Sequence, residues 1–441
     1  MVSKNHLKTP TKSQSNTLKF LFAGTFFVTV FIKPSANDPF NSPKFWILMA
    51  MSAYLLGFYY KNLKFLFKSQ STLFWLVLLF LASSLISTLK TENSYTAFFG
   101  DFQRRNGFLS YFALAVVFVT VISYFNFTHF RLLHKLFFAS TIIVGGYSWL
   151  QSIGYDFFPW NNPYNPIIST LGNPNFASAM MAIFASYFTV SIFAKTNKLK
   201  LSSYFFIILI LMWSIIKSQS RQGLIAYLFS IGIGLGILIL SKSRKFAFIY
   251  FTTYLTASIV AILGMLQHGP LRDYIYKDSV SVRGYYWRAA LNMFWHNPLF
   301  GVGTDSYLYY FKKYRQIGYP LKYGYEITSS NAHSVPLQIL ATNGILTASA
   351  YVLMFILIFI LGIRKIIEFK DERKIQMLSV FIAWLTYIFQ SMISIDNLAL
   401  GIWGWVLSGA IVAMSLDFSP KSESVYSPKY KTMSVRDRKN G

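Results

Sequence analysis

Long apolar runs dominate this chain and constrain its fold more than any other feature. A helix that crosses the hydrocarbon core of a bilayer needs about 20 predominantly apolar residues, or somewhat fewer where flanking side chains reach the interface. The runs lie near Thr17–Ile32, Phe45–Tyr60, Thr72–Leu89, Gly107–Phe125, Phe137–Ile153, Asn175–Ala194, Leu201–Ile216, Gln222–Leu240, Phe246–Leu266, Val335–Ile363, Ile375–Ser391 and Asn397–Leu416. Because 54% of the residues are hydrophobic and only 13% are charged, the composition excludes a soluble domain. We predict an all-α polytopic membrane protein with about twelve transmembrane helices.

Basic residues alternate between the two ends of these predicted helices. With the amino terminus inside, 26 of the 41 Lys and Arg residues lie on the inner side and 15 on the outer side, as the positive-inside rule requires. Both termini are then cytoplasmic. Residues 1–16 and 417–441 are predicted to be disordered, and residues 17–416 to form one transmembrane domain. Inner anchors that attract anionic headgroups account for most of the net charge of +26, so no nucleic-acid partner is indicated.

One long polar segment, residues 267–334, interrupts the apolar pattern. It carries eight Lys or Arg residues, two Trp and three His. The alternation of helices places this segment on the extracytoplasmic side of a membrane. Long loops cross the membrane largely regardless of their charge, so topology does not account for these basic side chains. Their presence therefore has another cause.

A tight connection, Lys217–Gly223, joins two apolar runs at the outer surface. Arg221 begins the second run, so its guanidinium lies at headgroup depth or points into a cavity. A snorkelling anchor is one interpretation. An anion clamp is the other, and the polar groups of Ser218, Gln219 and Ser220 beside two cations favour it.

The middle of the polar segment has the spacing of an amphipathic helix. Its apolar face consists of Trp287, Ala290, Leu291 and Phe294. Arg283 shares the Trp287 side of this helix. A helix lying on the membrane explains the aromatic residues, but it does not explain an unpaired charge on the apolar side, which is costly and usually has a partner.

Turn residues end this predicted helix at Pro298, and Gly301 and Gly303 follow. Four ionisable residues come next, Asp305, Lys312, Lys313 and Arg315. We expect these four side chains to face solvent or lipid headgroups.

His333 closes the polar segment, directly before a long apolar run. Pro336 suits the first turn of a helix, which places His333 just outside it, at the mouth of the bundle. An interfacial polar residue is one interpretation of this histidine. A metal ligand is not indicated, because no histidine or acidic spacing typical of such sites surrounds it. Cysteine is absent from the sequence, which excludes disulfides and thiolate chemistry.

Four short motifs, in order along the chain, resemble the O-antigen ligase and O-antigen polymerase superfamily of membrane glycosyltransferases with a GT-C-like fold. They are Gly172-Asn173-Pro174-Asn175-Phe176; Ser220-Arg221-Gln222-Gly223; Arg283 and Trp287 with Asn297-Pro298-Leu299-Phe300-Gly301-Val302-Gly303; and Ala332-His333-Ser334 with Leu337-Gln338 and Asn343-Gly344. The resemblance covers roughly residues 171–363. It implies transfer of a glycan from an undecaprenyl diphosphate carrier to a hydroxyl acceptor on the outer face of a bacterial cytoplasmic membrane, without metal, nucleotide sugar or other cofactor.

The residues fit this chemistry. A lipid diphosphate concentrates negative charge at headgroup depth, and Arg221 and Arg283 are the guanidinium groups expected to bind it. His333 is expected to accept or orient the acceptor proton while the hydroxyl attacks the anomeric carbon with inversion. Supporting roles in substrate binding are expected for Arg288, Lys217, Asp305, Tyr286 and Trp287.

Several alternatives remain open. The acceptor could be lipid A-core in lipopolysaccharide biosynthesis or another surface lipid or glycan, a growing polysaccharide, or a protein hydroxyl. The short outer segment favours a ligase over a protein transferase, which would need an acceptor domain of ordinary size. A transporter or flippase belongs to a different class. It would place ionisable residues near the middle of the membrane, whereas here they gather at the outer surface.

Overall fold

The computed structural model describes residues 12–59, 71–160, 167–194, 197–276 and 278–416, and these residues form helices and connections without strands. The α-helices are α1 (Lys12–Val30), α2 (Asn41–Tyr59), α4 (Ser71–Lys90), α5 (Ser94–Phe99), α6 (Phe108–Tyr124), α7 (Phe130–Ser152), α8 (Pro174–Ser191), α9 (Lys198–Lys217), α10 (Arg221–Leu240), α11 (Arg244–Met265), α12 (Arg272–Ile275), α13 (Asp278–His296), α14 (Tyr307–Tyr314), α15 (Gly318–Tyr323), α16 (Val335–Glu368), α17 (Asp371–Met392) and α18 (Leu398–Leu416). Two 3-10 turns, η1 (Phe127–His129) and η2 (Ser169–Leu171), complete the structure. The predicted all-α class is confirmed.

The number of spans differs from the prediction. In the described part of the chain, seven helices are long and apolar enough to cross a bilayer, namely α4, α9, α10, α11, α16, α17 and α18. A bent pair, α6 followed by residues 127–152, raises the number to eight if it counts as one span, and it is bent by 108° at the break. The prediction of about twelve spans is therefore not confirmed, although each apolar run of the described chain is helical.

Helix α8 shows why an internal helix can be less apolar than one that faces lipid. Nearly all of its side chains are buried in the bundle. The Ser178 hydroxyl accepts the backbone N–H of Gly223 at 3.1 Å, and the Thr386 hydroxyl donates to Ser186 at 2.8 Å. Polar groups satisfied in this way cost little inside a membrane protein.

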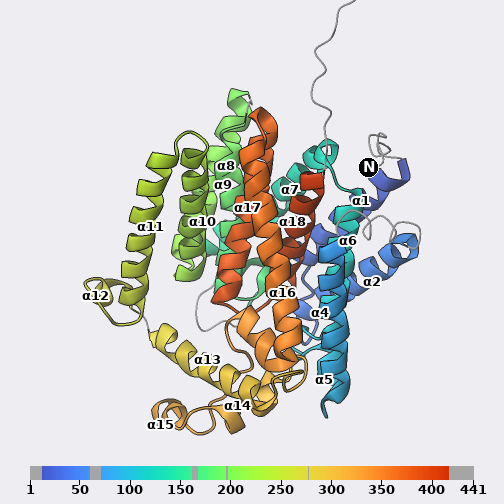
Figure 1. Cartoon of the computed structure of the whole chain (residues 1–441), viewed down its shortest axis with the longest axis vertical. Helices are drawn as coiled ribbons and strands as arrows, with labels where there is room; N and C mark the ends of the chain where they lie inside the picture. The colour runs from blue at the N-terminus through green and yellow to red at the C-terminus, as the bar shows by residue number, and fades with distance from the viewer. Residues whose placement is uncertain (1–11, 60–70, 161–166, 195–196, 277, 417–441) are drawn as a thin grey trace, which may run out of the picture.

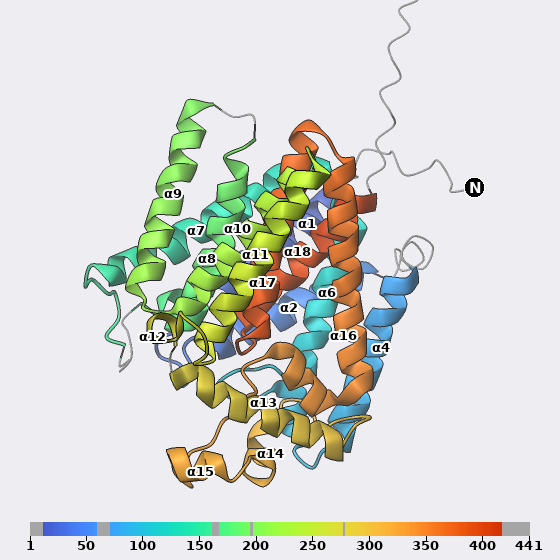
Figure 2. The same ribbon diagram turned by 60° about the vertical axis from the view of Figure 1, so that its left-hand side comes forward.

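The bundle has two distinct ends. The connections from α8 to α9, from α10 to α11 and from α16 to α17 lie at one end, and α13, α14 and α15 lie at the other (Figures 1 and 2). Helix α18 runs through the centre, and its residues from Leu398 to Ser415 are buried. A Cβ on Gly404 would lie 2.1 Å from the ring of Tyr387, so glycine allows α17 and α18 to approach closely.

Helix α16 is broken at Gly344, where the backbone has φ 75° and ψ −175°. Residues 335–343 form a short arm before the break, and residues 345–368 form the long arm. Only glycine adopts this conformation without strain. The prediction of one uninterrupted helix across this region is wrong, because the Asn343-Gly344 pair ends one helical arm and begins another.

The segment Pro298–Gly303 provides hydrogen-bond partners for backbone groups of α16 on both sides of its break. Three backbone hydrogen bonds join the two segments: Ile345 N to Pro298 O at 2.8 Å, Val302 N to Ala341 O at 3.0 Å and Gly303 N to Thr342 O at 2.9 Å. Buried backbone groups need such partners. The Asn-Pro and Gly-Val-Gly motifs of the sequence therefore have a structural role, since they fill the break in α16.

Polar side chains of α4 face the same break. Four hydrogen bonds connect them: Asn343 Nδ2 to Ser84 Oγ at 3.0 Å, Asn343 Nδ2 to Thr304 Oγ1 at 2.7 Å, Ser87 Oγ to Thr342 O at 2.9 Å and a Thr88–Thr304 hydroxyl pair at 2.8 Å. A hydroxyl-rich face in an otherwise apolar helix is thus satisfied internally. This network holds the short arm of α16 against the amino-terminal half of the chain.

Helix α13 packs on the short arm of α16. Its buried side chains there are Ala289, Ala290 and Met293. Small residues on this face allow close approach to α16. Leu291 of the predicted apolar face is 37% exposed and does not take part in this packing.

The first helix begins earlier than predicted. Helix α1 begins at Lys12 rather than near Thr17. The predictions of disorder for the first residues and for the tail fall on residues 1–11 and 417–441, which lie outside the described residues.

Candidate active site

His333 lies in a short turn at the start of the short arm of α16. Its φ of 53° is in the left-handed region, which is uncommon for a side chain of this size and often marks a functional position. Its backbone N–H donates to Asn331 Oδ1 at 2.9 Å. The preceding residue, Ala332, donates its N–H to Gln338 Oε1 at 2.9 Å. Two amide side chains therefore hold the turn from both sides.

Helix α13 brings two of the predicted residues to His333. The ring of Tyr286 stacks on the imidazole with 5.2 Å between ring centroids and 23° between planes. Tyr286 also packs against Phe311 and Tyr319, so its ring orients the imidazole. Burial raises the pKa of its hydroxyl, which therefore stays protonated. Arg283, one turn earlier on α13, is close enough for its charge to act on His333.

Arg104 approaches the same imidazole from the connection between α5 and α6. The charges of Arg283 and Arg104 both act on His333. Sequence reasoning missed Arg104, because more than 200 residues separate it from His333 in the chain. The available signal was its position among the outer basic residues, between Gly100 and Gly107 in a tight connection.

The site is electropositive. Burial first, and then the charges of Arg283 and Arg104, lowers the pKa of His333 to about 3. The imidazole is therefore neutral at physiological pH. Burial also lowers the pKa of Arg283, but a guanidinium stays charged. Within the described residues, neither arginine forms a direct ion pair with a carboxylate.

Asp305 is buried, so the expectation that it faces solvent is wrong. Its Oδ2 accepts the backbone N–H of Asp101 at 2.6 Å. Burial raises its pKa to about 7, although the Asp101 amide and the charge of Arg104 act in the opposite direction. Its φ of 52° turns the chain inward after Gly303. The run of ionisable residues that begins at Asp305 therefore does not share one environment.

The three basic residues after Asp305 lie nearer the surface. Lys312 and Lys313 are exposed, and Arg315 is half-buried. Lys312 pairs with Glu326 at 2.8 Å, and Arg315 donates to the carbonyls of residues 325 and 327.

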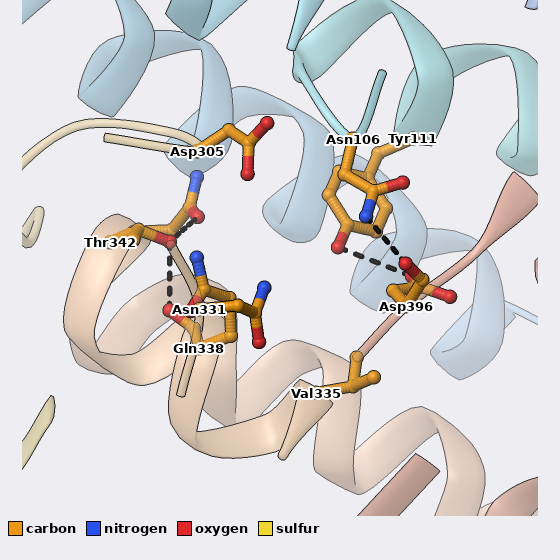
Figure 3. Close-up of a pocket in the computed structure, with 9 residues that line it drawn as sticks. Asn106, Tyr111, Asp305, Asn331, Val335, Gln338, Thr342 and Asp396 are labelled. Carbon is orange, nitrogen blue, oxygen red and sulfur yellow. Dashed lines mark hydrogen bonds between the residues drawn. The ribbon is translucent and has the colours of Figure 1, made fainter. Parts of the chain in front are cut away.

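A small polar pocket lies between the short arm of α16 and the loops that carry Asn106, Asp305 and Asp396 (Figure 3). Its lining consists of Asn106, Tyr111, Asp305, Asn331, Val335, Gln338, Thr342, Asn343 and Asp396. Asp396 comes from the connection between α17 and α18. Its backbone carbonyl accepts from Asn106 Nδ2 at 2.8 Å, and its Oδ2 accepts the Tyr111 hydroxyl at 3.3 Å. Burial raises the pKa of Asp396 to about 6.

The pocket contains an amide hydrogen-bond donor without a partner. Gln338 Nε2 is enclosed, and no hydrogen bond to it is found among the described residues. An enclosed donor without an acceptor is costly. This donor and the two carboxylates give the floor of the site both donors and acceptors.

Arg221 begins α10, next to the amino-terminal end of α8. Ser220, directly before it, donates its hydroxyl to Asn175 Oδ1 at 2.8 Å. Gln222, directly after it, donates to Gln390 Oε1 at 3.0 Å on α17. Its neighbours on both sides therefore hold the backbone of Arg221, while its own side chain is exposed. The groups that act on His333 belong to α13 and to the α5–α6 connection.

The remaining predicted residues occupy different places. Arg288 is exposed and donates to Gln316 Oε1 at 2.9 Å. Lys217 lies over the ring of Trp213, 4.7 Å from its centroid. Trp287 is half-buried, and its indole N–H is enclosed without a hydrogen-bond partner in the described structure.

No group of three or more His, Asp or Glu residues is placed to hold a metal ion in the described parts of the chain. The basic site contains groups that bind anions and a neutral imidazole that can accept a proton.

Fold and site together define a polytopic membrane protein with a basic, partly enclosed site at one end of its helices. Residues 204–352 match the family described as O-antigen ligase, which confirms the resemblance seen in the sequence. Over these residues the chain is similar to O-antigen ligases. No curated protein matches the chain. The matched region contains Arg221, Arg283 and His333, whereas Arg104 and Asp396 lie outside it.

Proposed function

We propose that this protein transfers a glycan from an undecaprenyl diphosphate carrier to a hydroxyl acceptor at the outer face of a bacterial cytoplasmic membrane. The observation that carries the proposal is the positive charge beside His333, where Arg283 forms no direct ion pair with a carboxylate of the described residues. Arg283 is largely enclosed, and burial disfavours its charge. An enclosed cation without a carboxylate partner is unfavourable unless a ligand brings the missing negative charge. A lipid diphosphate brings that charge at the depth of the headgroups.

The two ends of the bundle support the orientation of the proposal. Lys242 lies in the connection between α10 and α11, and Arg244 is the first residue of α11. Arg364 and Lys365 lie near the end of α16. These residues lie at the end opposite α13 (Figures 1 and 2). Because basic residues favour the cytoplasmic side, we place the His333 site on the extracytoplasmic side and both termini in the cytoplasm.

Arg221 is proposed to bind the same diphosphate. It stands at the amino terminus of α10, where the helix dipole favours an anion. The hydroxyl of Ser220 and the amide of Gln222 are both engaged with neighbouring helices, so the backbone at this position is well held. A guanidinium can donate two parallel hydrogen bonds to one phosphate.

The proposed reaction is a direct displacement. The acceptor hydroxyl oxygen attacks the anomeric carbon and forms the new glycosidic bond. The bond from that carbon to the phosphate oxygen breaks, and undecaprenyl diphosphate leaves with the electron pair. His333 accepts or orients the hydroxyl proton. Arg283 and Arg221 stabilise the negative charge on the leaving group, and attack from the opposite face inverts the anomeric centre.

Donor binding also prepares His333. In the empty site, Arg283 and Arg104 disfavour a protonated imidazole. A bound diphosphate offsets these positive charges and raises the pKa of the histidine. The imidazole then becomes a better proton acceptor when the donor is in place.

We propose a surface lipid or glycan, such as lipid A-core, as the acceptor. Helices α14 and α15 are short and pack with α13 and the short arm of α16 in one cluster, which leaves little room for a separate protein-acceptor domain. Trp287 offers an enclosed indole N–H without a partner in the described structure, and sugars present many acceptors for such a donor. Deletion of the gene is expected to remove capped glycolipid while full-length lipid-linked polymer persists. A product limited to one repeat would identify a polymerase instead.

A transfer assay tests the proposal. Purified wild-type protein, Arg221→Ala, Arg283→Ala and His333→Ala receive an undecaprenyl diphosphate-linked glycan and lipid A-core in the absence of metal. The exposed Lys313→Ala variant serves as the matched control. We expect transfer by the wild type and the control and a loss of at least about 100-fold in each site variant. Normal turnover in all three site variants at unchanged protein levels would reject the site.

A further inference from the structure

We propose that Arg104 is a third arginine of the donor site and binds the diphosphate together with Arg283. This inference rests on the proposed function and adds a residue from outside the matched region 204–352. The geometry that points to it is a closed loop, Gly100–Gly107, which joins α5 to α6 and holds Arg104 within range of electrostatic interaction with His333.

The Gly100–Gly107 loop closes tightly on itself. Gly100 has φ 80°, and a Cβ there would lie 2.3 Å from the backbone N of Asn106. A Cβ on Gly107 would lie 2.2 Å from the backbone N of Gly100. Glycine at both ends is therefore required for the ends to touch. Within the loop, the N–H groups of Arg104 and Arg105 both donate to Asp101 O, at 3.0 and 2.8 Å.

Three segments distant in sequence anchor the loop. The Asp101 N–H donates to Asp305 Oδ2 at 2.6 Å, Asn41 Nδ2 donates to Gln103 O at 2.8 Å, and Asn106 Nδ2 donates to Asp396 O at 2.8 Å. A loop bonded at three points is held in one conformation. Its position relative to the His333 turn is set through Asp305 and Asp396, which line the same pocket as Asn331 and Val335 on either side of His333.

The two neighbouring arginines of the loop have different environments. Arg105 donates its Nε–H to Ser42 Oγ at 3.2 Å and lies over the rings of Phe102 and Phe45, at 4.9 and 5.9 Å from their centroids. Its side chain is therefore used to hold the loop against α2. Arg104 has no such partner, because its enclosed Nε makes no hydrogen bond to a described residue.

A structural role for Arg104 as counterion of Asp305 is the main alternative. The charges of Asp305 and Asp101 do act on Arg104. Within the described structure, however, Arg104 forms no direct ion pair with either carboxylate, and the Asp305 carboxylate accepts a backbone N–H instead. The enclosed Nε donor is thus left for a group that the chain does not supply. Since the charge of Arg104 reaches His333, an anion bound beside the imidazole lies within its range.

Binding of undecaprenyl diphosphate to the full-length protein in nanodiscs tests the inference. The variants are Arg104→Gln and, as a matched control, Arg272→Gln, since Arg272 is exposed and forms an ion pair with its neighbour Asp273. Undecaprenol, the same lipid without phosphate, measures binding of the tail alone. We expect Arg104→Gln to weaken diphosphate binding at least about tenfold, as loss of a charged hydrogen bond does. Undecaprenol binding and the Tm are expected to stay at wild-type values, and Arg272→Gln to behave as wild type.

A double variant keeps the test decisive if Arg104→Gln is unstable. Arg104→Gln combined with Asp305→Asn removes both charges, and the amide oxygen at position 305 can still accept the Asp101 N–H. We expect this protein to be folded and to bind the diphosphate at least about tenfold more weakly than Asp305→Asn alone. Equal diphosphate binding by these two proteins would overturn the inference and leave Arg104 as a counterion.

The failure of this inference is distinguishable from that of the proposed function. If wild type binds undecaprenyl diphosphate no better than undecaprenol, the proposed function fails, and this inference with it. If Arg283→Gln loses the preference for the diphosphate and Arg104→Gln keeps it, the proposed function stands and the third arginine is rejected.

Discussion

Substitution of Gly344 by alanine tests the role of the break in α16. Gly344 has φ 75° and ψ −175°, a region of backbone conformation that only glycine occupies readily. An alanine there would also place its Cβ 2.3 Å from the carbonyl carbon and oxygen of Leu299. Both backbones must move, because neither atom belongs to a flexible side chain.

The cost has two parts. Holding alanine in this conformation costs about 1–3 kcal/mol. The clash with Leu299 separates the segments joined by the Ile345–Pro298 and Val302–Ala341 hydrogen bonds, each of which contributes about 1 kcal/mol. We therefore expect destabilisation of about 3–5 kcal/mol. Because the short arm begins directly after His333, transfer activity is expected to fall further than the amount of folded protein does.

Thermal unfolding in nanodiscs measures the loss of stability. The transfer assay, carried out on the folded fraction, measures the loss of activity. Gly146→Ala is the matched control, since Gly146 lies inside α7 and a Cβ there meets nothing within 4 Å. This control is expected to be stabilised by about 0.5–1 kcal/mol. A Gly344→Ala protein with the wild-type Tm and wild-type turnover would refute the account of the break.

Two further predictions concern buried charges. Burial raises the pKa of Asp305 from 3.8 to about 7. Between these pH values the folded state keeps a proton that the unfolded state releases. The free energy of unfolding therefore falls as the pH rises from about 4 to about 7. Asp305→Asn is expected to remove this dependence and to stabilise the protein by up to about 4 kcal/mol at pH 8; Tm values at pH 5 and pH 8 measure it, and equal pH dependence in both proteins would contradict it. Arg283→Met removes an enclosed cation without a described carboxylate partner, so we expect a higher Tm together with loss of transfer. A lower Tm would show that the guanidinium is compensated within the protein.

Features encoded by local sequence were predictable. Pro336 marks the first turn of α16 and places His333 outside it. The apolar runs predicted where the long helices lie. The number of membrane spans was harder to predict, because the apolarity of a helix depends on whether it faces lipid or other helices. Helix α8 is buried among other helices, and its serines form hydrogen bonds with them. Its length and polarity alone therefore did not predict that it lies inside the bundle.

Features that depend on distant segments were missed. Asp305 was placed in solvent because a run of ionisable residues follows it, yet the positive φ at Asp305 turns it inward to meet the amide of Asp101. The Asn343-Gly344 pair was visible as a motif, but only the approach of Leu299 explains the glycine. Arg104 acts on His333 from a loop anchored by Asp305 and Asp396, and no local sequence pattern predicts that these segments lie near one another.

The central claim is that the positive charge around His333 awaits an anionic ligand, and the titration of this histidine tests it most directly. Isotope-labelled histidine in the full-length protein gives the imidazole pKa by NMR, and His333→Gln assigns the signal. We expect a pKa near 3 in the empty site and a rise when undecaprenyl diphosphate is added, with no rise on addition of undecaprenol. A pKa near 6.5 in the empty site, or one that the diphosphate leaves unchanged, would contradict the account.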